Sequence, residues 1–157
     1  MEHLLLEVKN LSVSIDGPAG EVQAVRDVSF SLKRGEVLAI VGESGCGKSV
    51  LCKSIMKLLP PSAKIKEGSI CVNGQDITCY REREMQKLRG RVFAMIFQDP
   101  MTSLNPTIKI GKQIGEAVVI HNKNYTKEQV NKKVLELMEL VAVSYTHLRA
   151  HETLANL

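Results

Sequence analysis

Eight consecutive residues have the composition and spacing that a phosphate site requires. They are Gly42, Glu43, Ser44, Gly45, Cys46, Gly47, Lys48 and Ser49. The glycines permit backbone angles closed to other residues and let the chain approach an anion, toward which successive N–H groups point. Lys48 is a cation for the β- and γ-phosphates, and the Ser49 hydroxyl is suited to ligate Mg²⁺. This is the P-loop pattern, G-x-x-x-x-G-K-S, and it predicts that residues 42–49 (the P-loop) bind the phosphates of a nucleotide.

The segments on either side of the P-loop are of the kind that position such a loop. Residues 37–41, Val-Leu-Ala-Ile-Val, predict a buried parallel strand that leads into it. Residues 50–59 predict a helix with one apolar face, and the two prolines that follow end it. The alternative is a glycine-rich turn that binds nothing, and the presence of both flanking elements disfavours it.

The remaining pattern predicts an antiparallel β layer and further helices. Residues 4–15 and 22–32 read as two strands joined by the turn cluster 16–20, with a change of register around Asn10 in the first strand. Residues 68–72 predict a short strand, and Asn73-Gly74 after it is a strong hairpin signal.

The second half of the chain is predicted to be mostly helical. Residues 82–89 are dense in charge and favour a solvated helix, residues 92–97 predict a second buried strand, and the chain reads as helix from residue 108 on. Thr126 and Gln129 have the spacing of a capping box, so a further helix is expected to begin there.

Composition excludes several classes of protein. The 157 residues suffice for about one domain with a real core. The longest apolar runs are about five residues, against roughly 20 for a membrane-spanning helix, and no secretory signal is visible, so a cytosolic location is the default. The net charge of +4 comes from scattered basic residues without interleaved aromatics, which disfavours nucleic acid as a partner. The four cysteines form no C-x-x-C pair, so neither a zinc site nor a disulfide framework is indicated.

A second motif narrows the class. Residues 94–106, Ala-Met-Ile-Phe-Gln-Asp-Pro-Met-Thr-Ser-Leu-Asn-Pro, resemble the Q-loop region of ATP-binding cassette (ABC) transporter ATPases, and in particular the dipeptide, oligopeptide and nickel importer branch. Residues 11–13, 24–30 and 41–45 resemble the same branch. The resemblance covers about residues 4–143, and the two motifs stand at the separation usual for the family.

The resemblance implies a fold and a set of roles. The fold would be α/β: a P-loop NTPase core with an antiparallel β layer in residues 1–110, and the start of a helical subdomain in 111–143. ATP and Mg²⁺ would be the cofactors, with Gln98 contacting Mg²⁺ and the attacking water. The intact parent would be an ATPase on the cytoplasmic face of the cell membrane, coupling ATP hydrolysis to uptake of di- or oligopeptides or a related solute. Its partners would be transmembrane permease subunits, a second ATPase subunit and, indirectly, a solute-binding protein.

Three departures from the family pattern qualify this expectation. No aromatic residue lies in 15–25 to stack on adenine, which leaves an aliphatic contact such as Val22. The signature motif, the acidic Walker B strand and the switch histidine are not found in the sequence. Residues 144–157 break the pattern abruptly and resemble translated read-through joined to a truncated gene, the alternative being a divergent C-terminal helix.

We therefore expect the chain as given to bind ATP without hydrolysing it at a useful rate. The competing hypothesis is a P-loop ATPase unrelated to transport. It would be either kinase- or GTPase-like, or a soluble cassette protein of repair or translation.

Overall fold

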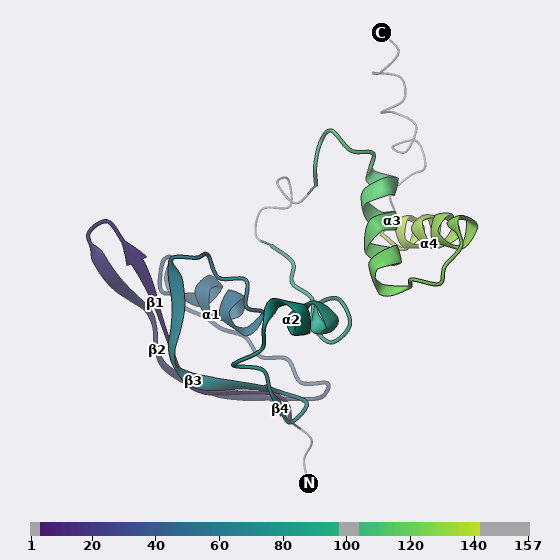
Figure 1. Ribbon diagram of the computed structural model, residues 1–157. Helices are drawn as coiled ribbons and strands as arrows, with labels where there is room; N and C mark the ends of the chain where they lie inside the picture. The colour runs from purple at the N-terminus through teal and green to yellow at the C-terminus, as the bar shows by residue number, and fades with distance from the viewer. Residues whose placement is uncertain (1–3, 98–103, 142–157) are drawn as a thin grey trace. The chain divides into compact units, whose positions relative to one another are not determined.

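The computed structural model describes residues 4–97 and 104–141, and the chain divides into two units, residues 1–93 and 94–157. The first unit is built on a four-stranded antiparallel sheet in the order β2-β1-β3-β4 (Figure 1). Its strands are β1 (Leu4–Gly17), β2 (Gly20–Lys33), β3 (Ala63–Val72) and β4 (Gln75–Asp76), and its helices are α1 (Lys48–Ile55) and α2 (Glu82–Leu88).

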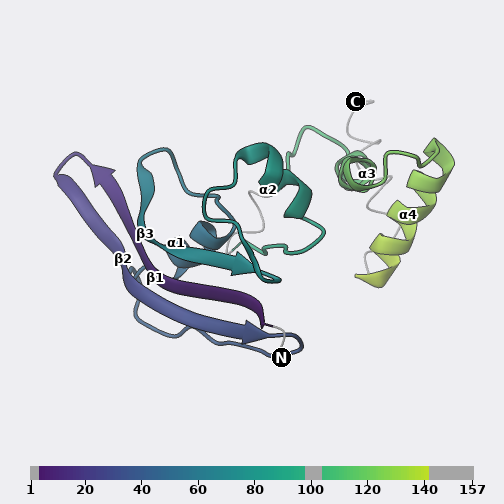
Figure 2. The same cartoon turned by 60° about the horizontal axis from the view of Figure 1, so that its bottom comes forward.

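One face of the sheet holds the core of this unit. Leu51 of α1 and Met85 of α2 are buried against apolar side chains of the sheet, so both helices cover the same face. The buried sheet residues are Val8, Leu11, Val13, Val25, Ile70 and Val72. In Figures 1 and 2 the long strands are bent, and α1 lies on the concave side of the bend.

A row of three left-handed residues crosses the sheet, one in each long strand. Asn10 of β1 has φ 48°, Asp27 of β2 has φ 46° and Gly68 of β3 has φ 95°. The pairing of β1 with β2 and with β3 shows irregularities around these residues. The predicted change of register at Asn10 is therefore confirmed, and the two neighbouring strands share it.

The short elements of the first unit follow their local sequence signals. Asn73 and Gly74 form the predicted hairpin turn between β3 and β4, both with positive φ (51° and 77°), as a primed turn requires. Helix α2 occupies the charged stretch predicted to be helical. β3 is longer than predicted because it begins at Ala63.

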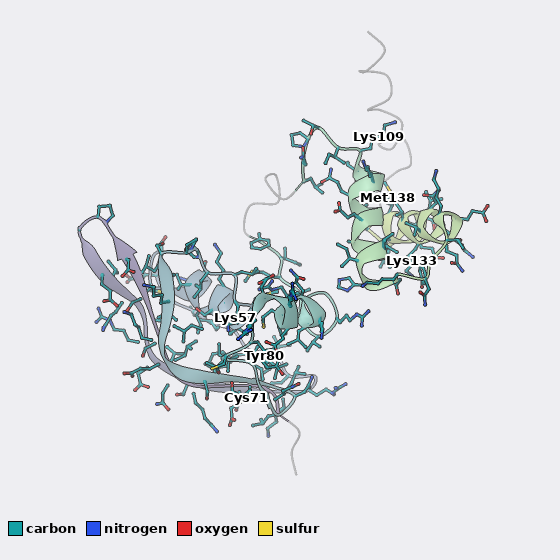
Figure 3. The ribbon with its side chains drawn as sticks, in the orientation of Figure 1. Lys57, Cys71, Tyr80, Lys109, Lys133 and Met138 are labelled. Atoms are coloured by element: carbon teal, nitrogen blue, oxygen red, sulfur yellow. The ribbon has the colours of Figure 1, made fainter. Side chains whose placement is uncertain are left out.

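The second unit contains a pair of helices, α3 (Ile110–His121) and α4 (Lys127–Leu140). Val118 of α3 is buried, as are Val134 and Met138 of α4, and the two helices contact each other. Met138, labelled in Figure 3, lies in α4 beside α3. The predicted capping box is confirmed: the Gln129 N–H donates to Thr126 Oγ1 (3.3 Å), and the Thr126 N–H donates to Gln129 Oε1 (2.8 Å).

Two predicted strands are wrong. Residues 37–41 and 92–97 form no strand, and Val37, Val41 and Ile96 are 93%, 90% and 98% exposed rather than buried. A strand needs a hydrogen-bonded neighbour, and no strand in the described residues pairs with either segment. The sheet is therefore wholly antiparallel within those residues, apart from an isolated parallel bridge between Arg89 and Phe93. None of the helices described in the two units is long and apolar enough to cross a membrane.

Candidate phosphate-binding site

The P-loop forms a turn that ends in the first residue of α1. Gly47 is the N-cap of α1 with φ 92°, makes no side-chain cap hydrogen bond, and is followed by a first turn without acidic residues. The first N–H groups of a helix have no partner within it, and the helix dipole places a partial positive charge there. This end of α1 is therefore suited to receive an anion.

Lys48 folds back over the loop that precedes it. Its ammonium nitrogen donates to the carbonyl oxygens of Gly42 (2.8 Å) and Glu43 (2.6 Å), and it lies 3.4 Å from Cys46 Sγ. The Cys46 N–H donates to the Glu43 carbonyl and closes the turn. The only lysine of the P-loop is thus held at the loop rather than extended into solvent, where its charge adds to that of the helix end.

The glycines of the P-loop serve two different purposes. Gly45 (φ 82°) and Gly47 (φ 92°) adopt left-handed backbone angles of the kind that glycine permits. Gly42 does not have a positive φ. Gly42 is needed for space instead, because a Cβ there would lie 2.7 Å from Cys46 Sγ.

Gly47 also connects the P-loop to the sheet. A Cβ at this position would lie 2.1 Å from the carbonyl oxygen of Ala24 and 3.8 Å from Cγ2 of Val25, both in β2. No local sequence signal predicts this contact. It depends on an irregularity in the pairing of β1 with β2, where Val13 pairs with Val25 but Ser14 pairs with Gln23, leaving Ala24 as an extra residue.

The metal ligands that were predicted from sequence are only partly described. Ser49 lies exposed in the first turn of α1, directly after Lys48, whereas Gln98 lies outside the described residues. Mg²⁺ prefers oxygen ligands and usually retains waters while binding substrate phosphates, so a single serine hydroxyl beside a phosphate cradle fits it. Among the described residues, no group of three His, Cys, Asp or Glu side chains offers a separate metal site.

A surface cavity lies along β2, next to the residue that meets the P-loop. It has a volume of about 420 Å³ and is lined by Glu21, Val22, Gln23 and Arg26. Val22 is 61% exposed. A hydrogen bond from Lys66, with N···O 2.8 Å, lowers the pKa of Glu21, so this carboxylate is charged and held at the cavity wall. No local motif marks Glu21, Gln23 or Arg26, and only their closeness to Ala24 in the fold places them near the P-loop.

The far end of α1 is fastened to the segment that contains α2. Arg89 Nε donates to the carbonyl of Met56 and Nη2 to that of Lys57, each at 3.0 Å, while Nη1 donates to Glu82 at 2.6 Å. Lys57 in turn donates to the carbonyls of Thr78 and Tyr80, each at 2.7 Å (Figure 3). The helix that carries the P-loop is therefore fixed at both ends.

A glycine-rich turn at an uncapped helix start, with lysine and serine as the first helical residues, defines a P-loop nucleotide-binding protein. The ABC transporter family matches residues 25–156, and the chain belongs to this family. The resemblance seen in the sequence is thereby confirmed, and with it the α/β cassette fold.

Several known proteins are similar to the chain. It is 52% identical over 149 residues, 94% of its length, to the oligopeptide transport ATP-binding protein OppD of Bacillus subtilis (strain 168). It is 51% identical over 90% of its length to the dipeptide transport ATP-binding protein DppD of Lactococcus lactis subsp. cremoris. The chain spans 41% of each of these two relatives.

Solved structures share the fold. The ATP-binding cassette MJ0796, in a dimeric post-hydrolysis state bound to ADP and Pi, has a TM-score of 0.76 at 20% identity, over 91% of this chain and 60% of that one. The structure of cbiO1 from Clostridium perfringens, part of an ABC transporter complex, has a TM-score of 0.66 at 25% identity, over 92% of this chain and 53% of that one.

Proposed function

We propose that the chain is part of the ATP-binding subunit of an ABC importer for di- or oligopeptides, and that it binds Mg-ATP through the P-loop. The observation that carries the proposal is the convergence of the uncapped start of α1 and the Lys48 ammonium at residues 42–49. The similarity to oligopeptide and dipeptide transport ATP-binding proteins supports the solute class.

Binding would exchange one set of partners for another. The β- and γ-phosphates would take the Lys48 ammonium from the carbonyls of Gly42 and Glu43, and charge-assisted bonds to phosphate are stronger than bonds to a neutral carbonyl. Ser49 would hold Mg²⁺. The adenine would lie against Val22 in the cavity along β2, because this is the part of the sheet that meets the P-loop.

Turnover would need more than the P-loop. Phosphoryl transfer depends on positioning and on neutralising charge around the γ-phosphate. Residues 42–49 supply the cradle, and Gln98 is proposed to contact the metal and the attacking water. We propose that the acidic strand, the signature motif and the switch histidine come from the rest of a longer parent and from a second ATPase subunit. The parent would act as a peripheral protein bound to permease subunits at the cytoplasmic face of the membrane. A solute-binding protein would deliver the solute to the permease.

The test is Mg-ATP binding by the 157-residue chain, measured by calorimetry. We expect Lys48→Ala to abolish binding, because it removes the cation aimed at the phosphates. Lys53→Ala is the matched control, since Lys53 lies in the last turn of the same helix and should leave the affinity unchanged. Equal affinity in wild type and Lys48→Ala would refute the proposal.

A further inference from the structure

The three left-handed residues of the bent sheet change which side chains of each strand face the core. In β1 the buried apolar side chains are Val8 on one side of Asn10, and Leu11 and Val13 on the other. Side chains alternate along a strand, so an even-numbered residue and two odd-numbered ones can share a face only if one extra residue lies between them. Asn10 is that residue.

The same change occurs in both neighbouring strands. In β2, Val28 and Phe30 are packed against the core, whereas Val25 is buried beyond Asp27. In β3, Ile70 and Val72 are buried on one side of Gly68, whereas Ala63 and Ile65 face inward on the other. Each strand therefore contains one extra residue at the same row. The register of β1 is the same on either side of the row: Val8 pairs with Phe30 and Val13 with Val25 in β2, before the further shift at Ala24, and Val8 pairs with Ile70 and Val13 with Ile65 in β3.

Side chains and close backbone contacts hold the row together. Asn10 Nδ2 donates to Asp27 Oδ1 at 2.8 Å. The backbone N–H groups of Asn10 and Asp27 donate to the hydroxyls of Ser29 (2.8 Å) and Ser12 (3.1 Å), so serine oxygens satisfy donors at the irregular positions. A Cβ at Gly68 would lie 2.5 Å from the Lys9 carbonyl oxygen, so β1 and β3 approach closely there.

The row lies directly beside the seat of the P-loop. Val25 and Ala24, which Gly47 contacts, lie two and three residues beyond Asp27 in β2. Without the extra residue, the alternation of β2 would turn Val25 outward and move the Ala24 carbonyl away from Gly47. The contact that holds the start of α1 against the sheet thus depends on the row as well as on the extra residue at Ala24.

We propose that Asn10, Asp27 and Gly68 are positioning residues for the P-loop, which act by setting the phase of β2 so that Val25 and the Ala24 carbonyl meet Gly47. The effect on nucleotide affinity rests on the function proposed above, whereas the effect on the P-loop itself does not.

The test compares two asparagines that share a left-handed conformation. Asn10 (φ 48°) lies in the row, and Asn73 (φ 51°) lies in the β3–β4 turn. Alanine disfavours this conformation at both positions and glycine allows it. Amide hydrogen exchange of residues 47–51 reports the P-loop seat, because the Leu51 N–H donates to the Gly47 carbonyl. Mg-ATP affinity and the melting temperature are measured on the same variants of the full 157-residue chain.

We expect Asn10→Ala to speed amide exchange at residues 47–51 and to weaken Mg-ATP binding about tenfold. A change of this size lies within the free-energy cost of placing alanine in the left-handed conformation. Asn10→Gly should restore both readouts although it also lacks the bond to Asp27. Asn73→Ala should lower the melting temperature about as much as Asn10→Ala does. It should leave the amide exchange of residues 47–51 and the Mg-ATP affinity unchanged. If Asn10→Ala fails to fold, Asp27→Ala against Asp27→Asn makes the same comparison in β2.

Two results would overturn the proposal. One is an equal effect of Asn10→Ala and Asn73→Ala on the exchange of the P-loop amides. That result would mean that the row contributes to overall stability and does not position the P-loop. The other is a loss of melting temperature in Asn10→Ala with exchange at residues 47–51 unchanged. If the exchange pattern is as expected but wild type binds no Mg-ATP, the proposed function fails and the positioning role stands.

Discussion

Gly45 and Gly47 have nearly the same backbone conformation but different surroundings. Both have positive φ, 82° and 92°. A Cβ at Gly45 would meet nothing within 4 Å, whereas a Cβ at Gly47 would lie 2.1 Å from a backbone oxygen of β2. Substituting Gly45 would therefore test the cost of the left-handed conformation alone, whereas substituting Gly47 would add the cost of a steric clash.

This difference gives a prediction for a matched pair of variants. Gly45→Ala should lower the free energy of unfolding by about 1–2 kcal/mol, the cost of a left-handed alanine. Gly47→Ala should cost clearly more and should also abolish Mg-ATP binding, because the start of α1 must move away from β2. Urea unfolding and calorimetry measure the two quantities. Equal losses of stability in the two variants would show that the close contact with Ala24 adds nothing to the cost of the Gly47 substitution.

At this scale the sequence indicated a candidate site but not its packing. The motif alone indicated Lys48 and Ser49, since their spacing from the glycines is fixed by local geometry. The contact of Gly47 with Ala24 and the cavity beside Val22 could not be predicted, because they depend on where β2 carries an extra residue. Only the register change at Asn10 left a signal, in the alternation of apolar residues.

Among the elements, α1 depends on a contact that is distant in sequence. The guanidinium of Arg89, whose side chain is 19% exposed, donates to two carbonyls at the C-terminal end of α1 and also to Glu82. A planar group with several donors can satisfy all three acceptors at once, whereas a lysine is a single point charge.

We therefore expect Arg89→Met to lower the free energy of unfolding by about 1.5–3 kcal/mol, the range for hydrogen bonds to a charged group. Arg89→Lys should recover only a small part of this loss. Chemical denaturation of the three proteins checks the prediction. Full recovery in Arg89→Lys would mean that charge, and not the fork of donors, holds the end of the helix.

Glu82 adds a pH dependence with a definite sign. Its hydrogen bond to Arg89 lowers its pKa below the ordinary value of 4.5, so the bond stabilises the folded state above that pH. Stability from this bond is lost as the pH falls from 4.5 through the lowered pKa. Melting curves between neutral and acid pH should thus show a smaller acid-dependent loss in Glu82→Gln than in wild type. An identical loss in the two proteins would contradict the assignment.

Elements with local signals were predicted well, and elements without a local partner were not. The start of α4 and the β3–β4 turn follow from Thr126 with Gln129 and from Asn73-Gly74, each of which acts within a few residues. Residues 37–41 have the composition of a buried strand, but a strand forms only with a hydrogen-bonded neighbour. Composition gives no information on whether that neighbour is present.

At the scale of the whole molecule, residues 37–41 give the first unit an apolar surface. Val37, Leu38, Ile40 and Val41 are 93%, 45%, 39% and 90% exposed. Contiguous apolar patches on a protein surface commonly mark an interaction site or a liability to aggregate. We propose that further strands of a longer parent cover this segment.

The same pair of substitutions in two contexts tests this idea. In the 157-residue chain, Val37→Ser with Val41→Ser should leave the melting temperature unchanged and reduce self-association and the binding of a hydrophobic dye. In a full-length parent the pair should be strongly destabilising, by about 2 kcal/mol or more, since buried valines are lost. A large loss of stability in the short chain would show that these valines are already packed.

The row formed by Asn10, Asp27 and Gly68 also limits how the length of these strands can change in evolution. Deleting one of the three residues would invert the facing of one strand relative to its neighbours and expose half of its apolar side chains. Deleting all three at once would keep the strands in step with one another. Insertions and deletions should therefore accumulate at the hairpin ends of this sheet, such as Pro18 and Ala19, and be purged from its middle. In descendants of this sequence, a change in the length of one of the three strands should be accompanied by the same change in the other two.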